Sequence, residues 1–146
     1  NNSLLEALTE RYNSFFNVPY KEKPIWYEGS NTSLVDVKVK CYDEYNNLIN
    51  YNPDGDNLLS KNVSIDFSIV GAAAFSSNTK IYWQVVNTGE EARSRNCLRG
   101  GFENSNIYNY GRHECTAYTG THWVQAFIVN NGECIAKSKE ILVKIK

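Results

Sequence analysis

From Leu34 to the C-terminus, apolar residues recur at every second position in a series of short segments. Side chains of a β-strand point alternately to its two faces, so this period predicts strands with one buried face and one polar face. The segments with this pattern or with a high content of β-branched and aromatic residues are 35–42, 63–69, 80–87, 112–119, 123–130, 133–136 and 140–145.

Turn signals separate these segments. Asn52-Pro53-Asp54-Gly55 is a typical turn sequence, and Asn130-Asn131-Gly132 predicts a tight hairpin between its two neighbours. About seven short strands over about 110 residues predict a mainly β fold, an antiparallel immunoglobulin-like β-sandwich preceded by one N-terminal helix. A small β-barrel is the alternative architecture.

Residues 1–33 lack the period of two. Ser3 and Glu6 form a capping box, which predicts a helix over residues 4–14. We interpret residues 20–33 as a linker, and residues 34–146 as a β-sandwich domain. Either the helix packs on this sheet, or it is the tail of an upstream domain in a longer protein, since the chain begins at Asn1 without Met. Apolar residues near helical spacing support the helix: Leu4, Leu5, Leu8, Tyr12, Phe15 and Phe16.

Composition excludes several classes of protein. A net charge of -1 and a pI of about 6.2 argue against broad binding to nucleic acid, although a few Arg residues can hold one small anion. No apolar run reaches the roughly 20 residues of a membrane helix, so we expect no membrane partner. The four cysteines match no zinc pattern, and we favour reduced thiols in a cytoplasmic protein over two disulfides in a secreted one.

Polar and glycine-containing groups stand where predicted strands meet loops. They are Asn87-Thr88-Gly89, Arg99-Gly100-Gly101 and Gly120-Thr121-His122. A core strand does not need such groups, whereas a ligand site on a β scaffold uses their donors and backbone freedom. The guanidinium groups of Arg93, Arg95, Arg99 and Arg112 suit a phosphate, and successive Gly amides can bind an anion. The alternative is a solvated loop in which the Arg residues pair with Glu90, Glu91 and Glu103.

The sequence predicts no catalytic residue, no metal site and no cofactor, and hence no enzyme. His113 and Cys115 lie only two positions apart, with no second close pair of zinc ligands. A Cys–His nucleophilic pair involving Cys97 or Cys115 is formally possible, but neither has a recognisable catalytic context. We expect Trp83 in the core. We expect His122 and Trp123 on opposite strand faces, with one of them inside and the other outside or in a cleft.

Three motifs in this order resemble one family. They are the strand Tyr82-Trp83-Gln84-Val85-Val86-Asn87-Thr88-Gly89, the turn Leu98-Arg99-Gly100-Gly101-Phe102, and Tyr118-Thr119-Gly120-Thr121-His122-Trp123. Together they resemble the adenylyl/guanylyl cyclase and SMODS C-terminal sensor domain, over roughly residues 34–146. The positions shared with the family pattern are Trp83, Asn87, Gly89, Arg99, Gly100, Phe102, Gly120 and His122.

The resemblance implies a regulatory role. Such domains follow bacterial cyclic-oligonucleotide synthases or nucleotide cyclases of antiviral (anti-phage) signalling, so it implies a nucleotidyltransferase or cyclase domain as partner, in cis or in a complex. It also implies a nucleotide or oligonucleotide ligand. The alternatives are a protein–protein docking domain and an effector-side receptor for a cyclic nucleotide messenger. The predicted ligand-binding residues are Asn87, Arg99, Gly100, Arg112, His122 and Trp123.

Overall fold

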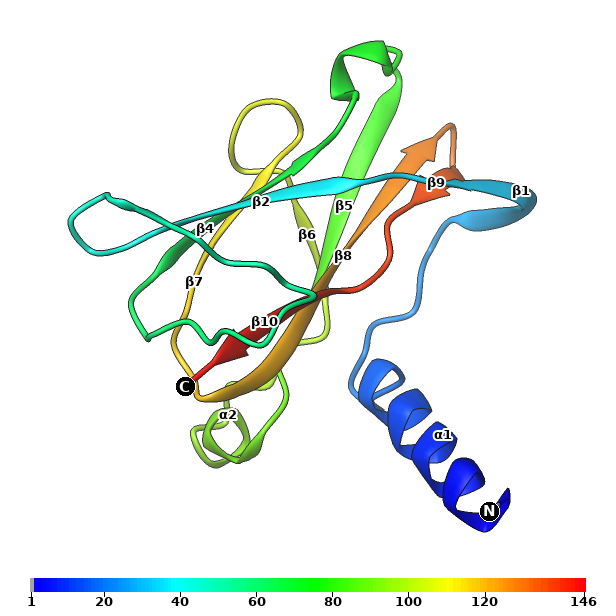
Figure 1. Ribbon diagram of the computed structural model, residues 1–146. Helices are drawn as coiled ribbons and strands as arrows, with labels where there is room; N and C mark the ends of the chain where they lie inside the picture. The colour runs from blue at the N-terminus through cyan, green and yellow to red at the C-terminus, as the bar shows by residue number, and fades with distance from the viewer. Residues whose placement is uncertain (1) are drawn as a thin grey trace.

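The computed structural model describes residues 2–146, apart from the side chains of residues 2, 8–13, 30 and 73. The chain is mainly β, with few short helices (Figure 1). The elements in chain order are α1 (Asn2–Phe16), β1 (Tyr27–Leu34), β2 (Val37–Tyr42), β3 (Leu48–Ile49), β4 (Ser64–Ile69), the 3-10 helix η1 (Ala72–Ala74), β5 (Thr79–Val86), α2 (Glu90–Ser94), β6 (Phe102–Asn104), β7 (Arg112–Cys115), β8 (Gly120–Asn130), β9 (Glu133–Lys137) and β10 (Ile141–Ile145).

The strands form two sheets. Sheet A has six strands in the order β1-β9-β8-β5-β6, with β10 paired to the first half of β8. Sheet B has four strands in the order β3-β2-β4-β7. All pairs are antiparallel except β1 with β9, which are parallel. The prediction of a wholly antiparallel sandwich was therefore wrong at this edge, where a strand arriving from outside the predicted domain joins the sheet.

The core lies between the sheets. Trp83 on β5 is fully buried and its ring centroid lies 6.0 Å from that of Phe67 on β4, so the two sheets meet at this aromatic contact. The indole Nε1 of Trp83 donates to the carbonyl of Tyr110 at 2.9 Å. A buried indole needs such an acceptor. The prediction that Trp83 is a core residue is confirmed.

Residues 15–26 cover the outer face of sheet A. Trp26 packs there on Tyr82, Phe102 and Phe127, with ring centroids 4.9, 4.6 and 5.4 Å away. We call residues 15–26 the strap, because they run across the sheet before β1 joins it. The prediction of a linker over residues 20–33 was wrong for its second half, since Tyr27–Leu34 forms β1.

Helix α1 projects away from the two sheets and approaches them at its C-terminal end (Figure 1). Leu4 and Leu5 on it are 61% and 64% exposed. The side chains of Leu8 and Tyr12, which belong to the predicted apolar stripe, lie outside the described residues. The described part of the helix therefore contacts the sandwich mainly through Phe15 and Phe16, near its end.

Two predicted turns are confirmed. The amide of Gly55 donates to the carbonyl of Asn52 at 3.0 Å, and Asn131 and Gly132 join β8 to β9 with φ values of 50° and 78°. Positive φ at both residues is the geometry of a tight hairpin turn. The predicted strand over residues 112–119 is shorter than expected and ends at Cys115, because the chain leaves sheet B there.

Candidate functional site: a cavity between the two sheets

A cavity of about 400 Å³ opens between the sheets at the end where β4, β5, β7 and β8 meet their loops. That volume lies within the range of small-molecule sites. Its walls are mostly apolar, and the polar groups concentrate near Asn87, Arg99, Glu114 and Tyr118. The lining residues are Ile65, Phe67, Val85, Asn87, Cys97, Leu98, Arg99, Glu114, Cys115, Thr116, Ala117, Tyr118, His122, Trp123, Val124, Val143 and Ile145.

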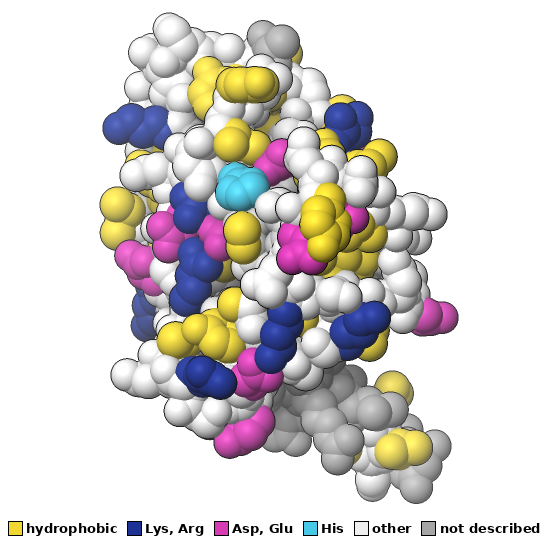
Figure 2. Space-filling view, turned by 90° about the vertical axis from the view of Figure 1, so that its left-hand side faces the viewer, with side chains coloured by type: hydrophobic (Ala, Val, Ile, Leu, Met, Phe, Trp, Pro, Cys, Tyr) yellow, Lys and Arg dark blue, Asp and Glu magenta, His cyan; other side chains and the backbone are white. Residues whose placement is uncertain are grey.

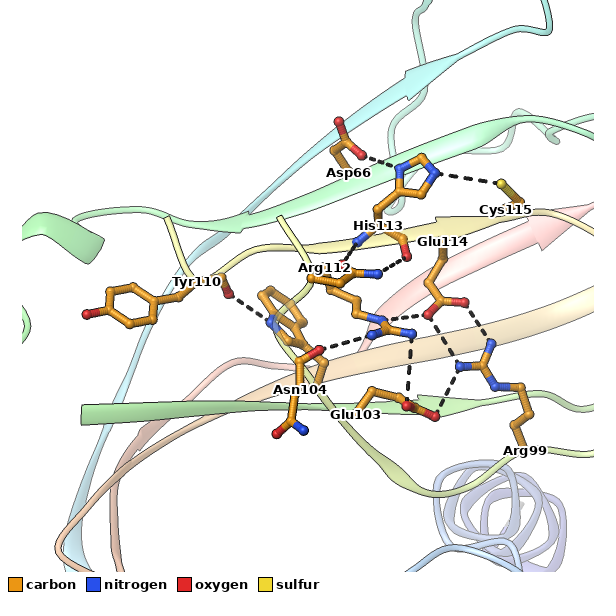
Figure 3. Close-up of polar contacts among 11 residues, drawn as sticks. Asp66, Arg99, Glu103, Asn104, Tyr110, Arg112, His113, Glu114 and Cys115 are labelled. Atoms are coloured by element: carbon orange, nitrogen blue, oxygen red, sulfur yellow. Dashed lines mark hydrogen bonds and ion pairs between the residues drawn. The ribbon is translucent and has the colours of Figure 1, made fainter. Parts of the chain in front are cut away.

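Four charged side chains form a cluster beside this cavity, and two of them, Arg99 and Glu114, line it (Figure 3). Arg99 Nη1 lies 2.7 Å from Glu114 Oε1, and Arg112 Nε lies 2.7 Å from Glu114 Oε2. Glu103 lies 3.3 Å from Arg99 and 3.9 Å from Arg112. We call these four residues the charge cluster. It joins β6, at the edge of sheet A, to β7, at the edge of sheet B, and its net charge is zero.

The charge cluster shifts the pKa values of its members. Burial alone would raise the pKa of Glu114, but the hydrogen bonds and positive charges of Arg99 and Arg112 outweigh it and lower that pKa. Burial would lower the pKa of Arg99, but Glu114 and Glu103 raise it overall. Both groups therefore stay charged at neutral pH. An anion entering the cavity would have to compete with two carboxylates for these guanidinium groups.

His122 holds two loops together. Its Nδ1 accepts a hydrogen bond from the Thr88 amide at 3.0 Å, and its Nε2 lies 2.8 Å from the Tyr118 carbonyl. A carbonyl only accepts, so Nε2 carries the proton and the ring is neutral. Burial lowers the pKa of His122, although the Tyr118 carbonyl raises it. The ring lines the cavity, but both of its nitrogens already have partners.

Asn87 and Trp123 connect the cavity wall to the strap. The carbonyl of Asn87 accepts from the Tyr20 hydroxyl at 2.5 Å, and its side-chain amide donates to the Cys97 carbonyl at 3.2 Å. Trp123 Nε1 donates to the carbonyl of Phe15 at 3.1 Å, and the Lys21 ammonium lies 5.7 Å from its ring. Period-two alternation puts the Trp123 side chain on the outer face of β8, with Phe127, away from the cavity interior.

His122 and Trp123 point to opposite faces of β8, as predicted, and His122 is the one that faces the cavity. Both are buried, with 5% and 0% of their surfaces exposed. The strap covers Trp123 on the outer face of sheet A, and the loops around Thr88 and Tyr118 cover His122. Both faces of β8 are therefore covered at this position.

Four of the six predicted ligand-binding residues line the cavity: Asn87, Arg99, His122 and Trp123. Gly100 and Arg112 do not. Gly100 lies against the strap, where its carbonyl accepts from the Glu22 amide at 2.8 Å. Arg112 lies beside the cavity, in the charge cluster. The sequence prediction missed Glu114, although the period of two in Arg112-His113-Glu114-Cys115 places it on the same face as Arg112.

Basic side chains outside the charge cluster are found on α2 and the residue that follows it. Arg93 and Arg95 are exposed, and within the described part of the chain neither forms an ion pair with an acidic side chain. The pKa of Tyr118, which lines the cavity, is raised overall, mainly by the side chain of Cys97. The positive charge of Arg95 acts in the opposite direction, so Arg95 lies near Tyr118. The alternative interpretation, in which the Arg residues pair with Glu90, Glu91 and Glu103, holds in part for Arg99 and Arg112. Both pair with Glu103, and both also pair with Glu114, which was not predicted. It does not hold for Arg93 and Arg95.

Two further observations bear on the class of site. Among the described residues, no group of three or more His, Cys, Asp or Glu side chains is placed to hold a metal ion. None of the helices described is long and apolar enough to cross a membrane. On the face shown in Figure 2, acidic and basic side chains intermingle beside one histidine, so that face carries no broad patch of one sign.

Comparison with known proteins agrees with the motifs. The sequence model of the Adenylyl/Guanylyl and SMODS C-terminal sensor domain family matches residues 12–146, which include the strap, both sheets and every residue that lines the cavity. No curated protein matches the chain. The match covers well over half of the chain, and the protein therefore belongs to the Adenylyl/Guanylyl and SMODS C-terminal sensor domain family.

Proposed function

We propose that this sensor domain binds a nucleotide or oligonucleotide in the cavity between its sheets and thereby controls a nucleotidyltransferase or cyclase domain, attached in cis or held in a complex. In this proposal the domain has no catalytic activity of its own and serves a bacterial antiviral, anti-phage signalling protein in the cytoplasm. Its four free thiols fit that compartment. The observation that carries the proposal is that strands β5 and β8 line the cavity and also hold the strap.

The ligand class follows from where apolar surface and charge lie. The interior offers Ile65, Phe67 and Val143, which suit a flat ring such as a nucleobase. Arg99 and Arg112 are balanced by carboxylates, whereas Arg93 and Arg95 are exposed and form no ion pair within the described residues. We therefore propose that the base enters the cavity and that the phosphates stay outside, near Arg95.

Ligand binding would reach the strap through two short paths. The first runs from the cavity through Asn87 to Tyr20, and the second runs through Trp123 to Phe15. The Arg99-Gly100 turn forms a further contact, through the Glu22 amide. A ligand that shifts the ends of β5 and β8 would favour one position of the strap over another, and so bias the domain upstream of it.

Titration of the purified domain tests ligand binding. Nucleotides, cyclic di- and trinucleotides, and short RNA and DNA are added in turn while intrinsic Trp fluorescence is read. We expect a saturable change with one class, since Trp123 is among the residues that line the cavity and its indole contacts the strap. Ala117→Phe, which places a ring among the lining residues, should abolish it, whereas the matched variant Ala74→Phe on η1 should not.

Charge variants test the proposed orientation of the ligand. Arg95→Ala should weaken binding about tenfold, which corresponds to the loss of one charge-assisted contact of about 1.4 kcal/mol. Glu114→Gln should not strengthen binding, because in this orientation the phosphates do not reach Arg99 and Arg112. If no class of ligand binds, or if Ala117→Phe binds as the unmodified domain does, the cavity is not the sensing site.

The exposed apolar residues of α1 favour a second candidate, a protein–protein docking domain. Leu4 and Leu5 lie on the part of the helix that projects away from the sandwich. In that case the domain would hold its partner with no nucleotide present, and Leu4→Glu would release the partner while leaving the cavity intact. A pull-down with the catalytic partner, with and without nucleotide, separates the two functions.

A further inference from the structure

Three reactive side chains lie in a row on the outer face of sheet B, and the last of them, Cys115, also lines the cavity. Asp66 stands on β4 directly opposite His113 on β7, and Cys115 follows two residues later on the same strand face. His113 Nδ1 lies 2.6 Å from Asp66 Oδ1, and His113 Nε2 lies 3.8 Å from Cys115 Sγ (Figure 3). We call these three residues the thiol row.

The proton positions in the thiol row follow from its partners. The ionised carboxylate of Asp66 can only accept, so His113 Nδ1 carries the proton and Nε2 presents its lone pair to the thiol. The Asn106 side chain fixes the backbone at this point, since its Oδ1 accepts from the His113 amide at 2.6 Å and its Nδ2 donates to the His113 carbonyl at 3.1 Å. The imidazole is therefore oriented to take a proton from Cys115.

This order of groups is that of an activated nucleophile, in which an acid orients a base that faces a thiol. It is not a metal site, because Asp66 and Cys115 contact opposite nitrogens of the ring and cannot converge on one ion. The groups across from the row on neighbouring strands are Lys40, opposite Asp66, and Ser64, opposite Cys115. Glu114 points to the other face of the sheet, toward Arg99 and Arg112.

The other cysteines differ from Cys115. Cys41 and Cys134 are 1% exposed, and burial raises the pKa of both, that of Cys41 to about 11. Cys97 is half-buried and its thiol donates to the Arg95 carbonyl at 3.3 Å. Cys115 is therefore the one exposed thiol of the four, and the one placed 3.8 Å from an imidazole.

We propose that Cys115 is a modification site, a nucleophilic thiol that hydrogen peroxide or another hydroperoxide oxidises to a sulfenic acid. The Cys115 proton passes to His113 Nε2, and the thiolate sulfur attacks one peroxide oxygen. The S–O bond forms as the O–O bond breaks, and His113 returns the proton to the departing oxygen as water or an alcohol. Sulfur is oxidised by two electrons and the peroxide is reduced by two. The proposal does not rest on ligand binding, although Cys115 is also one of the residues that line the cavity.

Alkylation rates test the activation of the thiol. Iodoacetamide is added at pH 7 to the folded domain and to the domain unfolded in urea, and each cysteine is followed by mass spectrometry. We expect Cys115 to react about tenfold faster in the folded chain, as a thiolate-stabilising neighbour predicts. His113→Gln should return it to the unfolded rate, and Asp66→Asn should give a rate between the two. An equal rate in folded and unfolded chains, or no effect of His113→Gln, overturns the proposal.

Peroxide labelling tests the modification itself. One equivalent of hydrogen peroxide followed by dimedone, which traps sulfenic acids, should label Cys115 and spare Cys97. His113→Gln should lose the label while unfolding at the same temperature as the unmodified domain, since the His113 side chain is 41% exposed and lies outside the core. Equal labelling of Cys97 and Cys115 would contradict a site built by His113 and Asp66.

Discussion

At the scale of single residues, the polar groups of the motifs stabilise the loops around the cavity. His122 joins Thr88 to Tyr118, and Asn87 joins Cys97 to Tyr20. These bonds fix the shape of the cavity mouth, whichever group contacts a ligand. A buried acceptor that loses its donor costs about 1–3 kcal/mol, so alanine at either position is expected to lower stability as well as binding.

The pKa of His122 gives a prediction on stability. The unfolded chain binds a proton at this side chain below about pH 6.5, and the folded chain does so only at lower pH, because burial lowers the folded pKa. The free energy of unfolding should therefore fall as the pH drops through 6.5, by at most about 1.4 kcal/mol per pH unit. Urea unfolding between pH 8 and pH 5 measures this slope.

One variant serves as the control for that slope. His122→Asn removes the titrating group, so its stability should change less over the same range of pH. An unchanged slope in His122→Asn would contradict the assignment.

At the scale of elements, the turn between the Arg99 loop and β6 packs closely against the strap. A Cβ added at Gly100 would lie 2.5 Å from the Tyr20 carbonyl oxygen and 2.9 Å from Lys21 Cα, both in the backbone. A Cβ at Gly101 would lie 3.1 Å from Glu22 Oε2, the end of a flexible side chain. The atoms nearest to Gly100 are backbone atoms, which cannot move without shifting the strap. The atom nearest to Gly101 is the end of a side chain, which can move aside.

The pair Gly100→Ala and Gly101→Ala tests the coupling between turn and strap. Gly100→Ala should displace the strap and destabilise the domain by about 1–3 kcal/mol, because backbone must move, whereas Gly101→Ala should cost less than about 1 kcal/mol. In the intact signalling protein, Gly100→Ala should still bind ligand and lose the catalytic response. Unfolding midpoints and turnover of the partner enzyme measure the two effects, and equal effects of both variants would argue against the strap as the path of control.

At the scale of the whole molecule, the strap and β1 belong to the structure of the sandwich. Trp26 covers Tyr82 and Phe127, and Phe16 covers Trp123 with ring centroids 5.8 Å apart. Uncovering large aromatic side chains costs roughly 1.5–3 kcal/mol each, out of a typical total stability of about 5–15 kcal/mol. The predicted domain boundary at residue 34 would thus remove a large fraction of the stability.

Truncation tests this boundary. A chain of residues 34–146 should unfold several kcal/mol more easily than residues 1–146, or fail to stay in solution. A chain of residues 18–146, which loses α1 and keeps Tyr20, Glu22 and Trp26, should lose only the contacts of Phe15 and Phe16 with Trp123, about 1–2 kcal/mol. Equal unfolding midpoints for residues 34–146 and 18–146 would show that the strap adds nothing to stability.

The sequence by itself determined seven of the strands, two turns and the family, and it did not predict β1, β3 and β6. The period of two around Val37 and Ile65 depends only on which side of a strand each residue faces, and Asn131-Gly132 depends only on local backbone preference, so both could be read without the fold. The sequence also predicted that Asn87, Arg99 and His122 belong to one site, because each lies in one of the three motifs that resemble the family. All three line the cavity.

Only the tertiary structure decided what each of these groups does. Arg99 meets Glu114, fifteen residues away, and Asp66 meets His113, forty-seven residues away, because strands from separate parts of the chain lie side by side. The parallel pairing of β1 with β9 and the packing of the strap on Trp123 also depend on contacts between residues that are distant in sequence. Local sequence patterns do not predict such contacts, because these contacts arise from the packing of the whole chain.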